Sequence, residues 1–299
     1  MNKPIVNVAI ALLLHRNKVL VGWRKATQHQ GNKYEFPGGK VEQAELPVQA
    51  CRREIREEVG IDITTWHPFD LIRHEYDDLH VHLHIFHSQL SLAQLDAIQH
   101  PWTWYSRAEL KDLAFPKAND PIIQRLNWCQ YLKISADLKD LNALNPDTWL
   151  YLRAAPTLDL IHGIHALPDL NLNKLIVNIE LWQALNAPVQ QKLAAVQIKH
   201  DQLMQLDASA LPLGLRSIAS CHDVLSVKQA RNMGCDAIML SPVLTTATHL
   251  DARPLGWEQF QQLGLSTEVP VFALGGLSPS DLKLAQQHGA YGVAGIRQF

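Results

Sequence analysis

One pattern in the second half of the 299-residue chain restricts its fold more than any other feature: short apolar runs recur at intervals of about twenty residues. Helical or loop segments separate these runs, which are QYLKI, WLYLRA, KLIVNI, AAVQIK, RSIAS, AIMLS, VPVFAL and GVAGI. Strands that alternate with helices predict parallel βα units, and eight of them predict a closed (β/α)8 TIM barrel. Because turn-rich segments such as GGLSPSD follow the strands, any site is expected at the carboxyl ends of the barrel strands.

The first part of the chain has a different organisation, with longer strands and one long helix. We predict strands at about 5–14 and 18–24 around a turn at His15 to Asn17, a loop rich in Gly and Pro at 31–40, a helix from about Pro47 to Val59, strands at 79–86 and 100–106, and a helix at 121–129. The change of pattern near residues 125–130 predicts a mixed α/β domain at 1–127 and the barrel at 128–299.

The composition is ordinary for a soluble globular protein, with 47% apolar residues, 19% charged residues and a net charge of −2. It gives no sign of a nucleic-acid polymer or a membrane as partner. The four cysteines form no Cys-x-x-Cys pair, so we expect a reduced, cytoplasmic location. The apolar run after Lys3 could be a secretory leader, but no small-residue cleavage site follows, and the strand interpretation is favoured.

The segment GKVEQAELPVQACRREIREEVGI, from Gly39 to Ile61, carries the main functional signal. On a helix, Glu54, Glu57 and Glu58 share one face because they are three or four residues apart. Three carboxylates on one face repel each other, which is acceptable if a hard cation such as Mg²⁺ lies there. An acidic helix face that simply contacts water is the alternative interpretation.

The spacing of the whole segment decides against that alternative, because the segment resembles the Nudix box at every specified position. Residues 4–127 further resemble the MutT type, which removes oxidised purine nucleoside triphosphates in nucleotide pool sanitation and DNA repair. The resemblance implies a Nudix α/β/α sandwich and a diphosphatase that needs Mg²⁺, or Mn²⁺ in its place. The implied reaction is hydrolysis of 8-oxo-dGTP or related oxidised purine nucleotides to the monophosphate and pyrophosphate.

The resemblance also implies roles for individual residues. The residues expected in catalysis are Glu54, Glu57, Glu58, Arg53 and Glu45, and the expected metal ligands are Gly39, Glu54, Glu57 and Glu58. The residues expected to contact the substrate are Arg24, His29, Phe36, Gly38, Gly39 and Asn119. Two simpler alternatives stay open, since Phe36 could be a core residue and Asn119 a helix cap. The general base is also open, because the position of a later family carboxylate falls at Ile98, with Asp96 nearby.

Residues 130–299 resemble thiamine phosphate synthase and its TenI-like relatives, through ASCH at 219–222, SPVLTTATHLDARPLGW at 241–257, ALGGL at 273–277 and the terminal GVAGI. These enzymes join a pyrimidine diphosphate to a thiazole phosphate. The candidate ligand residues that the resemblance implies are Arg153, Asn178, Ser220, Thr246, Thr248, Gly275 and Gly276. The two glycines could hold a phosphate through backbone N–H groups.

The barrel departs from this family at charged positions. Two family lysines fall at Ala155 and His249, and one metal-binding aspartate falls at Ile179, while a second falls at Asp201 or Gln202. Because a diphosphate leaving group needs charge at those points, we expect no synthase activity. The barrel then binds a thiamine-precursor phosphate as a sensor, serves as a scaffold, or assists hydrolysis of thiamine-type diphosphates.

Overall fold

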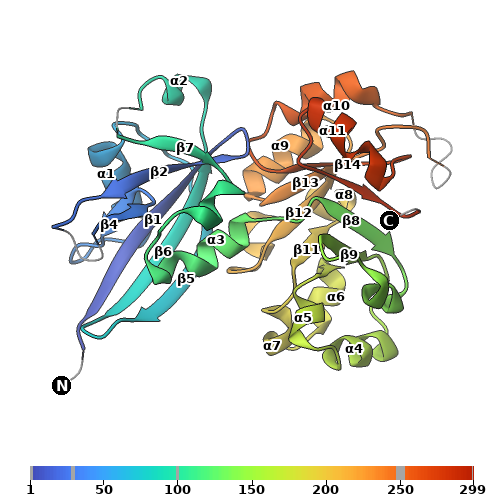
Figure 1. Cartoon of the computed structure of the whole chain (residues 1–299), viewed down its shortest axis with the longest axis horizontal. Helices are drawn as coiled ribbons and strands as arrows, with labels where there is room; N and C mark the ends of the chain where they lie inside the picture. The colour runs from blue at the N-terminus through green and yellow to red at the C-terminus, as the bar shows by residue number, and fades with distance from the viewer. Residues whose placement is uncertain (1–2, 28–30, 99–100, 247–252, 298) are drawn as a thin grey trace. The chain divides into compact units, whose positions relative to one another are not determined.

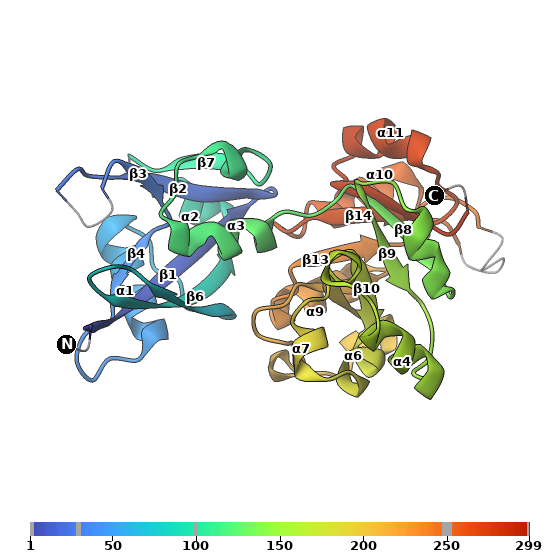
Figure 2. The same cartoon turned by 60° about the horizontal axis from the view of Figure 1, so that its bottom comes forward.

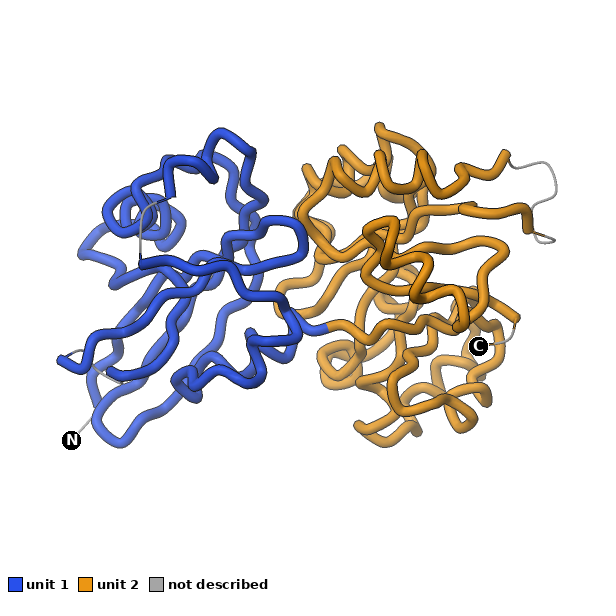
Figure 3. The backbone as a smooth tube through the Cα atoms, turned by 45° about the horizontal axis from the view of Figure 1, so that its top comes forward, with its two compact units in different colours: residues 1–127 blue, residues 128–299 orange. Residues whose placement is uncertain are grey.

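The computed structural model describes residues 3–27, 31–98, 101–246, 253–297 and 299. The chain divides into two compact units, Met1–Asn127 and Trp128–Phe299, which Figure 3 shows in blue and orange. Within the described residues, no helix has the length and apolarity that a membrane crossing requires.

The first unit is built around a seven-stranded mixed sheet (Figure 1). Its strands are β1 Ile5–His15, β2 Lys18–Arg24, β3 Lys33–Glu35, β4 Gly38–Lys40, β5 His67–Glu75, β6 His80–Gln89 and β7 Thr103–Ser106. The strand order is β3-β2-β1-β6-β5, with β4 beside β1 and β7 beside β2. The central pair of β1 and β6 is parallel, and the other pairs are antiparallel.

The predicted hairpin of the first two strands is confirmed. Arg16 and Asn17 form its turn with φ values of 44° and 62°, the left-handed pair that suits a two-residue hairpin loop. The segment 31–40, predicted as a loop, instead contributes the short strands β3 and β4. Strand β5 was not predicted, because the segment HPFDLIRHE has a proline at its second position and lacks regular alternation of apolar and polar residues. It is a strand because it pairs with β6.

The strands of this unit present two different faces. Ala9, Ala11 and Leu13 of β1 pack in one core cluster with Cys51 and Ile55 of helix α1 (Pro47–Glu58). The alternate residues of β1 point to the opposite face, since successive strand residues project to opposite sides. The other helices are α2 Leu92–Leu95 and α3 Asp120–Leu126, with short 3-10 segments at Glu109–Asp112 and Lys117–Asn119. The predicted helix at 121–129 is therefore shorter than expected and ends before Trp128.

The second unit is a closed barrel of eight parallel strands, as the sequence predicts (Figure 2). The strands are β8 Tyr131–Ser135, β9 Thr148–Leu152, β10 Leu175–Asn178, β11 Ala195–Ile198, β12 Ser217–Cys221, β13 Ala237–Leu240, β14 Val271–Leu274 and β15 Gly292–Gly295. The helices are α4 Leu158–His165, α5 Asp169–Leu172, α6 Ile179–Ala184, α7 Ala187–Gln190, α8 His200–Leu203, α9 Val224–Met233, α10 Gly256–Gly264 and α11 Leu282–Gln287. Each of the eight predicted runs forms one strand.

Alternation along the barrel strands separates the interior from the outer layer. Tyr151 and Ile176 belong to a buried cluster with Met239 and Phe272, which are contributed by strands around the barrel. Their neighbours Leu150 and Val177 belong to a second cluster, with residues of α4, α5 and α6. This packing leaves the carboxyl ends of the strands to form the mouth of the barrel, where loops follow them.

Candidate active site and barrel cavity

Helix α1 holds two of the glutamates, Glu54 and Glu58, against the glycine pair of β4. Its N-terminal turn starts at Pro47, where a missing N–H costs nothing, and the Gln49 side chain accepts a hydrogen bond from the Leu46 N–H at 3.0 Å. The helix ends at Glu58, and Gly60 follows the C-cap residue Val59 with a φ of +82°, which suits the position after a helix. Because Cys51 and Ile55 bury the apolar face, the glutamate face points away from the core.

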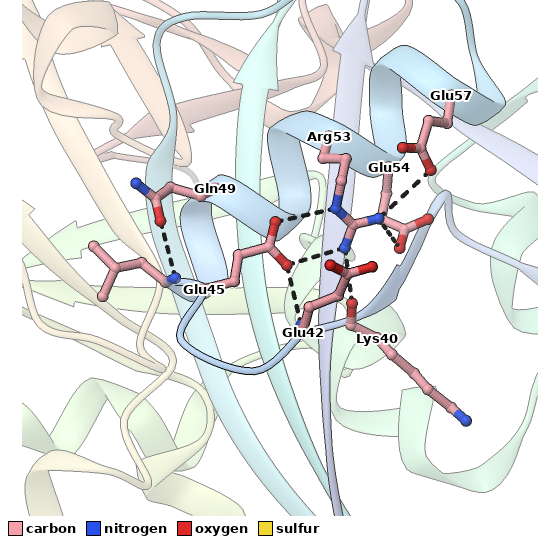
Figure 4. Close-up of polar contacts among 8 residues, drawn as sticks. Lys40, Glu42, Glu45, Gln49, Arg53, Glu54 and Glu57 are labelled. Atoms are coloured by element: carbon pink, nitrogen blue, oxygen red, sulfur yellow. Dashed lines mark hydrogen bonds and ion pairs between the residues drawn. The ribbon is translucent and has the colours of Figure 1, made fainter.

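Arg53 is the centre of the polar contacts on this helix (Figure 4). Its guanidinium donates to both carboxylate oxygens of Glu45 at 3.0 Å, to Glu54 Oε1 at 2.7 Å and to the Lys40 carbonyl at 3.1 Å. It also lies 3.5 Å from Glu57 Oε2. These hydrogen bonds lower the pKa of the Glu45 carboxyl group. Arg53 therefore orients Glu45 and Glu54, with little of its donor capacity left for a substrate phosphate.

The glycine pair brings the backbone against two of the glutamates. Gly38 has a φ of +145°, and a Cβ there would overlap the Ala9 carbonyl oxygen; a Cβ at Gly39 would overlap the Glu54 carboxylate. The Gly38 N–H donates to Glu58 Oε2 at 3.1 Å. The pair lies within the predicted loop at 31–40, but it belongs to β4, which pairs with β1 through Ala9 and Gly39. Gly38 therefore requires glycine, whereas a larger residue at Gly39 would displace the Glu54 carboxylate.

Glu58 has an unusual charge environment. Burial raises its pKa to about 7, and the carboxylates of Glu54 and Glu35 add to the rise, whereas the Gly38 N–H opposes it. A nearby cation would offset this cost, and oxygen donors alone are the set that Mg²⁺ takes in proteins. No group of three or more His, Cys, Asp or Glu side chains is arranged to hold a metal ion in the described part of the chain. The acidic donors nevertheless fit a hard divalent cation.

A cavity of about 250 Å³ lies on the sheet face opposite α1. Its apolar walls come largely from β1 and β6, including Val8, Ile10 and Leu83. It brings together five residues that the sequence predicted as substrate contacts: Arg24, Phe36, Gly38, Gly39 and Asn119. The glycine pair therefore borders both this pocket and the glutamates. His29, the sixth predicted contact, lies outside the described residues.

The structure bears on the two alternatives left open for pocket residues. Asn119 takes the N-cap position of α3, yet its side chain makes no capping hydrogen bond, and the residue is only 6% exposed. Capping therefore does not account for its side chain. Phe36 stacks on Phe115, with ring centres 4.8 Å apart, and is buried. It is thus a core residue and a wall of the pocket at once.

A second cavity, of about 670 Å³, opens at the carboxyl ends of the barrel strands. Four of the predicted ligand residues line it: Arg153, Ser220, Thr246 and Gly275. Its floor holds a directed hydrogen-bond chain, in which Tyr151 Oη donates to Gln197 Oε1 at 2.7 Å and Gln197 Nε2 donates to Ser220 Oγ at 2.8 Å. This chain leaves the Ser220 hydroxyl hydrogen directed away from Gln197.

The other predicted ligand residues of the barrel have different positions. Asn178 is buried, where it caps α6 through the Leu181 N–H at 2.9 Å and donates to the Ala154 carbonyl at 2.7 Å, so both ends of its amide serve the fold. Gly276, with a φ of +70°, packs against the Thr245 carbonyl and is not among the lining residues. Thr248 lies outside the described residues.

The cavity also contains basic side chains that the sequence did not select as ligand candidates. Lys199, His200, His222 and Arg253 line it together with Arg153. The Nδ1 of His222 donates to the Ser241 carbonyl at 2.7 Å, which places a proton on that nitrogen. The sequence indicated a loss of charge at the family's lysine positions, but Lys199 and Arg253 supply positive charge from other positions. Their chain positions, after β11 and before α10, gave no signal until the strands were placed.

Comparisons with known proteins agree with this division. A family model described as NUDIX domain matches residues 8–125, and one described as Thiamine monophosphate synthase matches residues 170–299. The 8-oxo-dGTP diphosphatase of Escherichia coli (strain K12) is 33% identical over 123 residues, which cover 40% of this chain and 95% of that protein. The chain belongs to the Nudix family.

Two further relatives show similarity to a different pyrophosphohydrolase and to a thiamine-phosphate synthase. The CTP pyrophosphohydrolase of Escherichia coli (strain K12) is 31% identical over 121 residues, which cover 40% of this Nudix chain and 90% of that protein. The "Putative thiamine-phosphate synthase 2" of Aquifex aeolicus (strain VF5) is 39% identical over 80 residues, and these cover 27% of this chain and 43% of that protein. A Nudix domain of the MutT type is thus fused to a domain of the thiamine phosphate synthase and TenI type.

The Nudix unit contains one pocket carboxylate that the sequence analysis did not select. Glu35 lines the pocket and accepts from Arg24 Nη1 at 2.9 Å. Burial raises its pKa, and Arg24 partly opposes the rise. Because Gly22 pairs with Glu35 across β2 and β3, Arg24 is its diagonal neighbour on the same face. Only the pairing of β2 with β3 brings Glu35 and Arg24 together. The sequence did not predict this pairing, because β3 has only three residues.

The structure does not supply the missing later carboxylate. Ile98 packs against the core cluster behind α1, and Asp96 is exposed at the C-terminal end of α2. Neither residue lines the pocket.

Proposed function

We propose that the Nudix unit is a Mg²⁺-dependent pyrophosphohydrolase of oxidised purine nucleoside triphosphates, with 8-oxo-dGTP as reference substrate. The products are the nucleoside monophosphate and pyrophosphate. One observation carries the proposal: the pocket with Phe36 and Asn119 borders the same glycine pair, Gly38 and Gly39, that lies against the glutamates. A nucleotide whose base fills the pocket can therefore direct its phosphates toward the carboxylates.

Recognition of the base uses the polar residues of an otherwise apolar pocket. The Asn119 amide offers both a donor and an acceptor, which is what a purine edge needs for discrimination. Phe36 is held in place by Phe115 and gives a fixed apolar wall. Arg24 is fixed by its ion pair with Glu35 at 2.9 Å, so its guanidinium is oriented at the pocket before a substrate arrives.

Catalysis rests on the acidic residues of α1. Glu54, Glu57 and Glu58, with the Gly39 backbone, would hold Mg²⁺ or Mn²⁺ ions. Such ions offset charge on the phosphate oxygens and acidify the attacking water. Arg53 keeps Glu54 and Glu45 in fixed orientations, and the close backbone at Gly38 and Gly39 keeps water and phosphate near the carboxylates.

The test is pyrophosphate release by the full chain with Mg²⁺. We expect 8-oxo-dGTP to be cleaved far faster than dGTP or CTP, and EDTA to stop the reaction. Equal rates on 8-oxo-dGTP and dGTP would reject the sanitising function. Preference for CTP would move the substrate to pyrimidine nucleotides while leaving the hydrolase class in place.

The fusion supports one further candidate, hydrolysis of a thiamine-type diphosphate with the barrel binding a thiamine-precursor phosphate as a sensor or scaffold. The match of residues 170–299 to the thiamine monophosphate synthase model motivates it. A panel of thiamine-related diphosphates, assayed under the same conditions, decides it. If none of them is cleaved, this candidate is removed.

A further inference from the structure

The turn between β5 and β6 places a phenol in the pocket of the Nudix unit. Tyr76 follows β5 directly and lines the pocket together with Leu79 of the same turn. Its backbone N–H donates to the Leu79 carbonyl at 2.9 Å, and its carbonyl accepts from Lys3 Nζ at 2.9 Å. The imidazole of His74 packs edge-on against the phenol, with ring centres 4.6 Å apart. These contacts give the phenol ring a fixed position at the pocket.

The hydroxyl group of Tyr76 is tied to the segment that carries Asn119. Tyr76, Ala118 and Asn119 all line the pocket, and β5 is in contact with the 3-10 segment Lys117–Asn119. A hydrogen bond with the Ala118 backbone opposes the rise in the phenol pKa that burial causes. A bond that lowers the pKa of a phenol is one that its oxygen accepts, so the Ala118 N–H is the donor. Ala118 is buried, and its N–H therefore depends on an acceptor from the protein.

The Asn119 side chain needs support from outside its own helix. It makes no capping hydrogen bond to α3, although the residue is buried at the N-cap position. Its backbone N–H donates to the Pro116 carbonyl at 2.9 Å, which closes the turn that Ala118 lies in. An amide that discriminates between bases must keep its donor and acceptor in fixed places, because a rotated amide presents the wrong group to the base edge. The backbone immediately before Asn119 is the part that Tyr76 holds.

We propose that Tyr76 is a positioning residue for base recognition: its hydroxyl group holds the Ala118 backbone and thereby keeps the Asn119 amide oriented toward the base. This inference rests on the proposed function, because it requires a nucleobase in the pocket. The role involves no contact between Tyr76 and the substrate. Selectivity between bases then depends on the hydroxyl group and the amide together, so the two residues act as one unit.

A double-mutant cycle tests the proposal, with steady-state hydrolysis of 8-oxo-dGTP, dGTP and CTP by the full chain in Mg²⁺. The variants are Tyr76→Phe, Asn119→Ala and the two combined. Tyr76→Phe keeps the ring and removes only the hydroxyl group. The matched control is Tyr105→Phe, because the hydroxyl group of Tyr105 is hydrogen-bonded to Tyr34 and Tyr105 is not among the described residues that line the pocket.

We expect Tyr76→Phe to lower the ratio of kcat/KM for 8-oxo-dGTP to kcat/KM for dGTP by about fivefold, mainly through a higher KM for 8-oxo-dGTP. In the Asn119→Ala background the same substitution should change this ratio by less than about twofold. Tyr105→Phe should keep the wild-type ratio. An unchanged ratio in Tyr76→Phe, an equal loss in both backgrounds, or a parallel loss on all three substrates would each overturn the proposal.

The same panel separates this inference from the proposed function. A wild type that cleaves 8-oxo-dGTP and dGTP equally rejects the sanitising function. The cycle is then evaluated on the ratio of dGTP to CTP, because the Asn119 amide also distinguishes a purine edge from a pyrimidine edge. A wild type without selectivity among the three substrates overturns both the inference and the proposed function.

Discussion

The candidate sites of the two units carry opposite charge. In the Nudix unit, Glu54 and Glu58 lie against a glycine pair, and the guanidinium of Arg53 is already taken up by carboxylates. In the barrel, Arg153 and Arg253 face a cavity whose described lining has no carboxylate. An acidic site can hold a polyanion only through metal ions, whereas a cationic cavity holds it directly. The contrast teaches that the sign of the lining charge, more than the fold, distinguishes a metal-assisted site from a simple anion site.

The largest expected effect comes from Glu57→Gln, which removes a charge from the acidic face. The side chain of Glu57 is 60% exposed, so we expect the fold to persist while kcat falls by about a thousandfold. Steady-state hydrolysis of 8-oxo-dGTP measures this. Glu42→Gln is the matched control, because Glu42 is an exposed acidic residue in the loop before the helix. A Glu57→Gln enzyme with near-normal turnover would contradict the acidic-site half of the comparison.

Arg53→Lys should have the next largest effect. A lysine cannot donate to Glu45 and Glu54 in the same fixed geometry, so we expect kcat to fall by about tenfold or more with little change in KM. Kinetics over a range of substrate and Mg²⁺ concentrations would check it. If KM rose while kcat stayed constant, Arg53 would be a substrate contact instead of a positioning residue.

Asn119→Ala tests the pocket and leaves the glutamates intact. Loss of the amide should reduce the preference for 8-oxo-dGTP over dGTP by about tenfold, since a base edge loses a hydrogen-bonding partner. The ratio of the two kcat/KM values is the measurement. An unchanged ratio would show that other residues read the base.

In the barrel, Tyr151→Phe removes the first donor of the floor chain and leaves the buried Gln197 carbonyl oxygen without its partner. We expect a loss of about 1–2 kcal/mol in the free energy of unfolding of the barrel, with normal Nudix turnover. Urea unfolding followed together with hydrolysis separates the two. A clear drop in Nudix turnover alongside the loss of barrel stability would argue that the Nudix site and the barrel are not independent.

The smallest effect concerns Asp62, which accepts two hydrogen bonds each from Arg52 and Arg56 at 2.7–2.8 Å. These bonds lower its pKa in the folded chain, so its stabilisation is present above the unfolded pKa of about 4 and is lost as the pH falls below it. Asp62→Asn should lower the unfolding temperature slightly at pH 7, because the pairs are exposed. The difference from wild type should shrink below about pH 4, and a difference that grows with acid would contradict this assignment.

Local patterns predicted much of the fold. The eight apolar runs became eight strands, and Pro47 and Gly60 delimited the glutamate helix, because burial periodicity and end residues act within a short stretch of chain. Strands β3, β4 and β5 were not predicted, because they are strands only through pairing with partners elsewhere in the chain. The basic residues of the barrel cavity were not predicted for the same reason, because they come together only when the strands are placed.

The sequence by itself determined the acidic helix face, the glycine pair and the family to which they belong, because these depend on spacing along one segment. Tertiary structure alone decided which side chains share a cavity. It placed Glu35 beside Arg24, assigned Asn178 to a helix cap, and set Arg253 in the cavity that Arg153 lines. The physical reason is that a site's charge is a sum over side chains from separate strands, and only closure of the sheet and barrel brings those side chains within reach of one another.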